Sequence, residues 1–190
     1  MRLVGRNYRM VVLTAPWFAA VAGFMAGLQP AGVEWRWFSF HPLLMTLGFV
    51  GMMANGVMVK KLGGYTNTKI HAKLSLAGMF MALGGLYVIY TNKEWYGRKH
   101  FTSVHSKAGM LVLIGCVLVG TAGTVFLHPD WGVSKYNQTI RFWHKWLARA
   151  VVLLGWCTCF AGLQQICYDN MFMAFYGLPL LALVPVTVVP

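Results

Sequence analysis

Charge is scarce in this chain, and acidic charge is the scarcest. Only 11% of the 190 residues are charged, whereas a typical soluble domain carries about a quarter. Asp and Glu together number 4, against 16 Lys and Arg. With 58% hydrophobic residues and a mean hydropathy of +0.59, this composition excludes an ordinary soluble domain and indicates an integral membrane protein. The formal charge of +12 could suggest a nucleic-acid partner, but no polar domain is present to carry a basic face, so no nucleic-acid binding is expected.

Paired cysteine motifs are also missing. The 4 cysteines form no CxxC pair, so neither a structural zinc site nor a disulfide framework is expected. The CxxCH motif that attaches a c-type haem covalently is absent as well. Any haem in this chain would therefore be held non-covalently.

Long apolar runs fill most of the sequence. A hydrocarbon core of about 30 Å needs roughly 20 residues of helix to cross it. We predict an all-α integral membrane protein in which residues 1–190 form a single transmembrane domain with six helices. The predicted spans are residues 10–28, 37–59, 69–90, 104–127, 140–165 and 171–189. The first span has the basic start of a signal peptide, but its length favours a retained helix.

Four of these spans carry a histidine near their entrance: His41, His71, His105 and His144. Because successive spans alternate in direction, His41 and His105 are expected near one face of the membrane. His71 and His144 are expected near the other. The central four-helix bundle, spans 2–5, would then hold one histidine pair at each depth.

Two intramembrane histidine pairs need partners, because polar side chains in hydrocarbon are costly and usually face a bundle interior. Bis-imidazole ligation of haem iron meets that need, and facing helices of a bundle are a common place for such a site. The pattern therefore predicts two haems, with all four histidines as iron ligands. A lone histidine at a span end is more often hydrogen-bonded to water or a neighbour, which is the interpretation we favour for His128. His100 is the other competitor, in the basic loop before His105.

The basic residues orient the spans. The face that receives both termini collects Arg2, Arg6, Arg9, Lys60, Lys61, Lys69, Lys73, Lys135, Arg141, Lys145 and Arg149. The opposite face has Arg36, Lys93, Arg98, Lys99 and Lys107. Under the positive-inside rule, both termini are cytoplasmic. We expect a multi-pass protein of the lipid bilayer, in an endomembrane or vesicle.

The histidine-headed spans, with two short motifs, resemble the cytochrome b561 family. The stretch SVHS at residues 103–106 is similar to the family's SLHS-type element. The stretch RKHFTSVH at residues 98–105 resembles the KH-x₄-H arrangement of its short, stand-alone members. The likeness is firmest from His41 to Gln165. It implies six helices, with non-covalent haem b between spans 2 and 4 and between spans 3 and 5, a pairing that span direction predicts independently.

The resemblance also implies an activity. Family members transfer electrons across a membrane from cytoplasmic ascorbate to a ferric chelate or to monodehydroascorbate on the opposite face, so an ascorbate-dependent transmembrane oxidoreductase is expected. They bind ascorbate through basic residues near the cytoplasmic haem, and the basic residues at that depth here include Lys69, Lys73, Arg141 and Lys145. Lys99 and His100 would correspond to the outer acceptor site. Family members are often dimers, so a homodimer is among the expected assemblies.

One departure from the family pattern follows the second span. The plant and chromaffin members carry an arginine-containing segment there, whereas this chain has Lys60 and Lys61. A second interpretation of the chain is a haem-bearing membrane anchor that passes electrons to or from a partner oxidoreductase. A third is a transporter or proton channel that uses the histidines without haem. Haem content, and haem reduction by ascorbate, distinguish the three.

Overall fold

Helices make up all of the regular structure in residues 2–29, 34–167 and 169–188, the parts of the chain that the computed structural model describes. In chain order they are α1 (Arg2–Gly27), η1 (Trp37–Ser39), α2 (Phe40–Thr46), η2 (Leu47–Met53), α3 (Ala54–Lys61), α4 (Tyr65–Trp95), α5 (Val104–Leu127), α6 (Gln138–Ile166) and α7 (Asn170–Val188). The predicted all-α fold is confirmed. Both α4 and α6 extend beyond their predicted spans, since a helix can continue into the polar interface after its apolar stretch ends.

Five helical segments are long and apolar enough to cross a membrane. They are Tyr8–Gly27, Trp37–Lys61, Gly64–Trp95, Val104–Leu127 and Gln138–Ile166. The apolar part of α7, Asn170–Pro185, is shorter. The chain is therefore an integral, multi-pass membrane protein.

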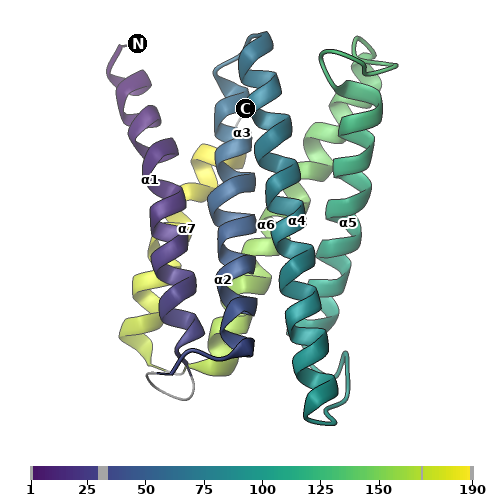
Figure 1. Ribbon diagram of the computed structural model, residues 1–190. Coiled ribbons are helices and arrows are strands. Elements are labelled where there is room, and N and C mark those ends of the chain that lie inside the picture. The colour runs from purple at the N-terminus through teal and green to yellow at the C-terminus, as the bar shows by residue number, and fades with distance from the viewer. Residues whose placement is uncertain (1, 30–33, 168, 189–190) are drawn as a thin grey trace.

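The helices lie side by side in a bundle (Figure 1). The continuous second helix, from η1 to α3, packs between α1 and α4. Next, α4 contacts α5 and α5 contacts α6, while α6 closes the ring by contacting α2 and η2. Outside this ring, α1 packs on the second helix, and α7 packs on α6 and α3. The start of α1 and the end of α7 lie at the same end of the bundle (Figure 1).

The second helix widens into a π-helical stretch, η2, in the middle of the bundle. Here it crosses α4 at Gly48 and Gly78. A Cβ atom on either glycine would lie 2.8 Å from the carbonyl oxygen of the other. Small residues permit such close helix crossings in membranes, and π-helical turns are frequent beside functional sites. The crossing thus holds the second helix closely against α4, the two helices that carry His41 and His71.

Candidate cofactor sites

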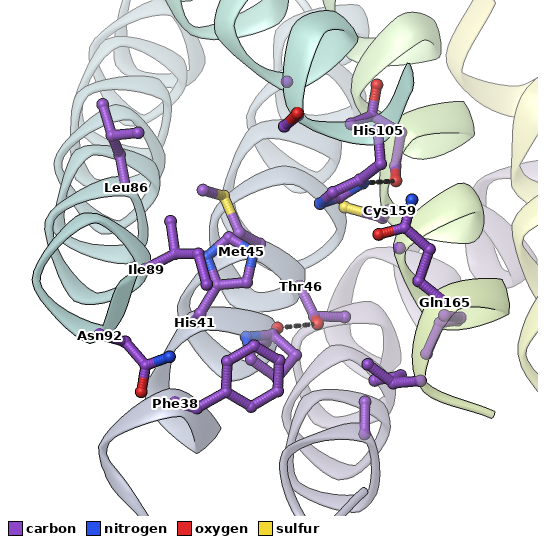
Figure 2. Close-up of a pocket in the computed structure, with 18 of the residues that line it drawn as sticks. Phe38, His41, Met45, Thr46, Leu86, Ile89, Asn92, His105, Cys159 and Gln165 are labelled. Atoms are coloured by element: carbon purple, nitrogen blue, oxygen red, sulfur yellow. Dashed lines mark hydrogen bonds between the residues drawn. The ribbon is translucent and has the colours of Figure 1, made fainter. Parts of the chain in front are cut away.

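A cavity of about 980 Å³ lies toward one end of the bundle. His41 of α2 and His105 of α5 both line it, and their rings point toward one another across it (Figure 2). The ring centroids are 6.2 Å apart and the ring planes are close to perpendicular, at 87°. The structure thus brings together the two histidines that span direction predicts at one depth.

A second cavity of the same volume, about 980 Å³, lies toward the other end. His71 of α4 and His144 of α6 line this one. Their ring centroids are 6.4 Å apart and their planes cross at 88°. His128, the alternative candidate for an iron ligand at a span end, stacks on Trp131 and is not among the residues that line either cavity.

Helical rise gives the separation of the two pairs. His71 sits near the start of α4, and the carbonyl of Gly85 farther along α4 accepts a hydrogen bond from His41. At 1.5 Å per residue, these two positions on α4 are roughly 21 Å apart. The two sites are therefore stacked along the bundle axis, one near each end.

Backbone carbonyls fix both rings of the first pair. His41 Nδ1 lies 2.9 Å from Gly85 O, and His105 Nδ1 lies 2.9 Å from Thr158 O. A carbonyl can only accept, so each Nδ1 carries the proton and donates it. Each neutral ring therefore leaves Nε2 with a free lone pair, the state in which histidine binds a metal.

In the second pair, only one of the two rings donates a hydrogen bond to a backbone carbonyl. His71 Nδ1 donates to Gly56 O at 3.0 Å, with Ser75 Oγ farther off at 3.5 Å. His144 Nδ1 is buried and has no hydrogen-bond partner among the described residues. The ring of His144 is nevertheless confined, because a Cβ atom at Gly123 would lie only 2.7 Å from its Cε1 atom.

The donor set fits a planar group with iron at its centre. Two imidazoles that share one metal ion, each with a metal–nitrogen bond of about 2.0–2.1 Å and about 1.1 Å from nitrogen to ring centre, have centroids up to roughly 6.2–6.4 Å apart. The observed spacings of 6.2 and 6.4 Å fall in that range. Carbonyls and glycines of the neighbouring helices confine the rings.

Basic side chains line the second cavity. They are Lys60, Lys61, Lys135, Arg141, Lys145 and Arg149. No Asp or Glu is among the described residues that line it. The family resemblance implies Arg141 and Lys145 as ascorbate ligands, and both line this cavity together with the second histidine pair.

The other two predicted ascorbate ligands lie outside this lining. Lys69 forms an ion pair with Asp130 at 2.8 Å, and the hydroxyl of Tyr65 also donates to Asp130. The bond from Lys69, and then that from Tyr65, lowers the pKa of Asp130. Lys73 is exposed on α4. These two lysines thus lie on α4 near His71 but do not line the cavity.

The first cavity has a smaller basic lining at its mouth, from Arg36, Lys93 and Arg98. His100 lines it as well, with Nε2 2.6 Å from Glu94 Oε1 and its ring stacked on Tyr90 at 4.6 Å. Lys99, the other predicted acceptor residue, does not line the cavity, and its carbonyl accepts a hydrogen bond from Lys93. Of the two predicted acceptor residues, only His100 reaches the cavity.

An apolar layer lies between the two cavities. Phe49 and Leu113 line the first cavity on one side of the layer, and Met53 and Cys116 line the second on the other side. All four are buried. Trp156 joins the layer, 3% exposed, and donates from Nε1 to the Phe49 carbonyl at 3.1 Å. Buried apolar side chains therefore separate the two histidine pairs.

The family model of eukaryotic cytochrome b561 matches residues 40–169, a range that contains the four histidines of the two pairs. The chain belongs to the cytochrome b561 family. Members of this family bind haem b, which agrees with the donor set of the two cavities.

Named relatives include two kinds of transmembrane reductase. Transmembrane reductase CYB561D2 of Bos taurus is 29% identical over 136 residues, which cover 64% of this chain and 61% of that protein. The Homo sapiens protein of the same name has the same identity and coverage. Transmembrane ascorbate-dependent reductase CYB561 of Homo sapiens is 26% identical over 160 residues, 80% of this chain and 63% of the relative. The matched part of this cytochrome b561 chain thus spans about three fifths of the length of these relatives.

Proposed function

We propose that this chain carries electrons across a membrane through two haem b groups. His41 and His105 would ligate one haem, and His71 and His144 the other. One observation carries the proposal: two histidine pairs, each at a ring spacing suited to one metal, line two separate cavities stacked along the bundle axis. Family membership supports the identity of the cofactor.

The protein's own groups have clear tasks in this scheme. A bound haem b supplies one-electron exchange between ferric and ferrous iron. The carbonyls of Gly85, Gly56 and Thr158 hold three of the four rings in the tautomer that leaves Nε2 free for iron. The buried layer at Phe49 and Trp156 keeps water out between the sites. Outer-sphere transfer needs no further catalytic residue.

The second cavity is the proposed donor site, with ascorbate as donor. Ascorbate is an anion at neutral pH, and the lining offers Arg141 and Lys145 with no opposing carboxylate among the described residues. Lys69 and Lys73, which lie on α4 near His71 but outside this lining, stay in the proposal as residues that the family resemblance implies. A relative named as an ascorbate-dependent reductase supports the choice of donor. The excess of basic residues at this end of the chain supports a cytoplasmic location for it and for both termini.

The first cavity is the proposed acceptor site, for a ferric chelate or monodehydroascorbate on the opposite face. His100 lines its mouth, and Lys99 is adjacent in the chain. Glu94 accepts a hydrogen bond from His100 Nε2–H, which orients the imidazole. A positively charged mouth attracts either acceptor, since both are anionic in common forms.

The test begins with an absorption spectrum of detergent-purified protein, oxidised and then after ascorbate or dithionite. We expect ascorbate to reduce the haem in the wild type. Arg141→Gln should need roughly 10–100-fold more ascorbate, because a hydrogen bond to a charged group contributes about 1.5–3 kcal/mol. Arg98→Gln, at the other cavity, is the matched control and should respond to ascorbate like the wild type.

Two results would redirect the proposal. Haem that dithionite reduces and ascorbate does not would favour the membrane-anchor interpretation, with electrons arriving from a partner protein. A colourless protein would refute the ligand assignment of all four histidines and favour a transporter or channel. In proteoliposomes that enclose a ferric chelate, external ascorbate should reduce the enclosed iron only when the protein is present.

A further inference from the structure

The loop between α5 and α6, residues 128–137, forms part of the wall of the second cavity. Pro129, Lys135 and Tyr136 of this loop line the cavity together with residues of the helices. Lys135 is the cation that the loop contributes to the lining. The position of the loop therefore decides where one positive charge of the proposed donor site lies.

Hydrogen bonds fold the loop back onto α5. Val133 N–H donates to Val125 O at 3.1 Å, and Ser134 N–H donates at 3.0 Å to the next carbonyl of α5. The indole Nε1–H of Trp131 donates to a further α5 carbonyl, that of Thr124, at 3.1 Å. These bonds hold the loop to the helix that it leaves, so its link to α4 must come from another residue.

Asp130 makes that link. Its Oδ2 lies 2.8 Å from Lys69 Nζ, and its Oδ1 accepts a hydrogen bond from the Tyr65 hydroxyl. Tyr65 and Lys69 are four residues apart on α4 and therefore lie on one face of the helix. Together their two bonds to Asp130, which we call the α4 clasp, tie the loop to the start of α4.

The α4 clasp lies next to the bond that places Lys135. Lys135 Nζ donates at 3.1 Å to the carbonyl of Pro129, the residue before Asp130. The carbonyl of Lys135 in turn lies 3.5 Å from an Nη atom of Arg141. A loop released from α4 would move Pro129 and Lys135 together, and would change the spacing of Lys135 and Arg141 in the cavity lining.

The charge of Asp130 is unfavourable at this place, because a carboxylate beside a basic cavity repels an anionic donor. The chain has 4 acidic residues, and the other three lie elsewhere. Glu94 contacts His100 at the first cavity, Asp169 accepts hydrogen bonds from the first turn of α7, and Glu34 is exposed before η1. A carboxylate beside the basic cavity therefore points to a task in which its bonds outweigh its repulsion.

We propose that Asp130 is a positioning residue of the donor site. Through the α4 clasp it holds the loop against α4 and keeps Lys135 in the wall of the second cavity. Lys69 contributes to the site through Asp130. This inference rests on the proposed function, because it treats the second cavity as the place where an anionic donor binds.

The test is the rate of haem reduction in the full-length holoprotein at increasing ascorbate concentrations, followed by stopped-flow absorption. In Asp130→Asn the half-saturating concentration should rise roughly 2–5-fold, the effect of losing an exposed ion pair, while the maximal rate stays unchanged. Asp130→Glu, which keeps the charge, should lie closer to the wild type. Loss of the negative charge alone would strengthen ascorbate binding, so a half-saturating concentration that falls or stays level in Asp130→Asn would overturn the inference.

Glu34→Gln is the matched control for the loss of one carboxylate. Glu34 lies two residues before Arg36, which lines the first cavity, so this variant should depend on ascorbate like the wild type. Tyr65→Phe removes one bond of the α4 clasp without a change of charge. It should raise the half-saturating concentration in the wild type and add nothing in Asp130→Asn. Additive effects would show that Tyr65 acts independently of Asp130 and would overturn the α4 clasp.

Hydrogen–deuterium exchange tests the α4 clasp without ascorbate. Amides of residues 128–137 should exchange faster in Asp130→Asn than in the wild type or in Glu34→Gln, because the loop opens more often once its link to α4 is lost. Equal exchange would overturn the α4 clasp and leave the proposed donor site intact. Ascorbate that fails to reduce the haem of the wild type would instead refute the proposed donor site, so the two failures are distinguishable.

Discussion

Gly162 leaves no room for a single added methyl group beside the ring of His105 in the first site. On α6 it faces the ring of His105, and an added Cβ would lie 2.8 Å from Cε1, 3.1 Å from Nδ1 and 3.4 Å from Nε2. Non-bonded carbon atoms rest at about 3.5–4.0 Å, so in Gly162→Ala the ring must retreat by roughly 0.7–1.2 Å. The bond from Nδ1 to Thr158 O, now 2.9 Å, would then exceed the usual limit of about 3.2 Å.

The expected loss is that of an outer-shell partner of a metal ligand, roughly 10–100-fold in affinity. The assay measures the rate of haem transfer from the holoprotein to an excess of a haem-scavenging protein. In Gly162→Ala, one of two haems should leave roughly 10–100-fold faster while the other stays at the wild-type rate. Gly84→Ala is the matched control, because its Cβ would meet only Leu44 Cδ1, at an ordinary 3.5 Å, and it should lose neither haem faster. If Gly162→Ala retains both haems like the wild type, the reasoning about the His105 ring is wrong.

Two further predictions concern stability. The bond from Lys69 holds the pKa of Asp130 below its ordinary value, so the ion pair stabilises the fold above the unfolded pKa of about 4 and loses that effect as pH falls through the lowered folded value. The unfolding temperature of Asp130→Asn should therefore be lower than that of the wild type at pH 7 and equal to it in strong acid. A difference in unfolding temperature that persists in strong acid would contradict this. Gly78→Ala should destabilise the bundle by about 1–3 kcal/mol, because the added methyl group overpacks against the Gly48 carbonyl. Gly84→Ala, the control, should unfold near the wild-type temperature. Equal unfolding temperatures for the two variants would refute the close crossing.

The depth of a residue in the membrane was predictable from the sequence. The prediction of the helices and of the histidine pairs depended on depth alone. Apolar length and the alternation of span direction were enough to predict the helices, and to pair His41 with His105 and His71 with His144. Hydropathy reports where along the membrane normal a residue lies. The structure brings each pair together as that argument expects.

Rotation about a helix axis was not predictable in the same way. Lys69 and Lys145 each lie within two residues of a histidine of the second pair, yet Lys145 lines the second cavity whereas Lys69 forms an ion pair with Asp130. Gly162 is one of 21 glycines, and no sequence pattern marks it as the one beside His105. The hydrogen bond from His105 to the Thr158 carbonyl could not be predicted either, because every residue has a backbone carbonyl whatever its side chain. These features depend on how α4, α5 and α6 are turned toward one another, which packing decides.

The pairing of the histidines is the central claim, and haem content of four single variants tests it most directly. His41→Ala and His105→Ala should each leave one haem per chain, with the same residual EPR signal. His71→Ala and His144→Ala should also leave one, with the other signal. Residual signals that sort in any other combination, for example identical spectra from His41→Ala and His71→Ala, would contradict two haem sites built across the bundle from these pairs.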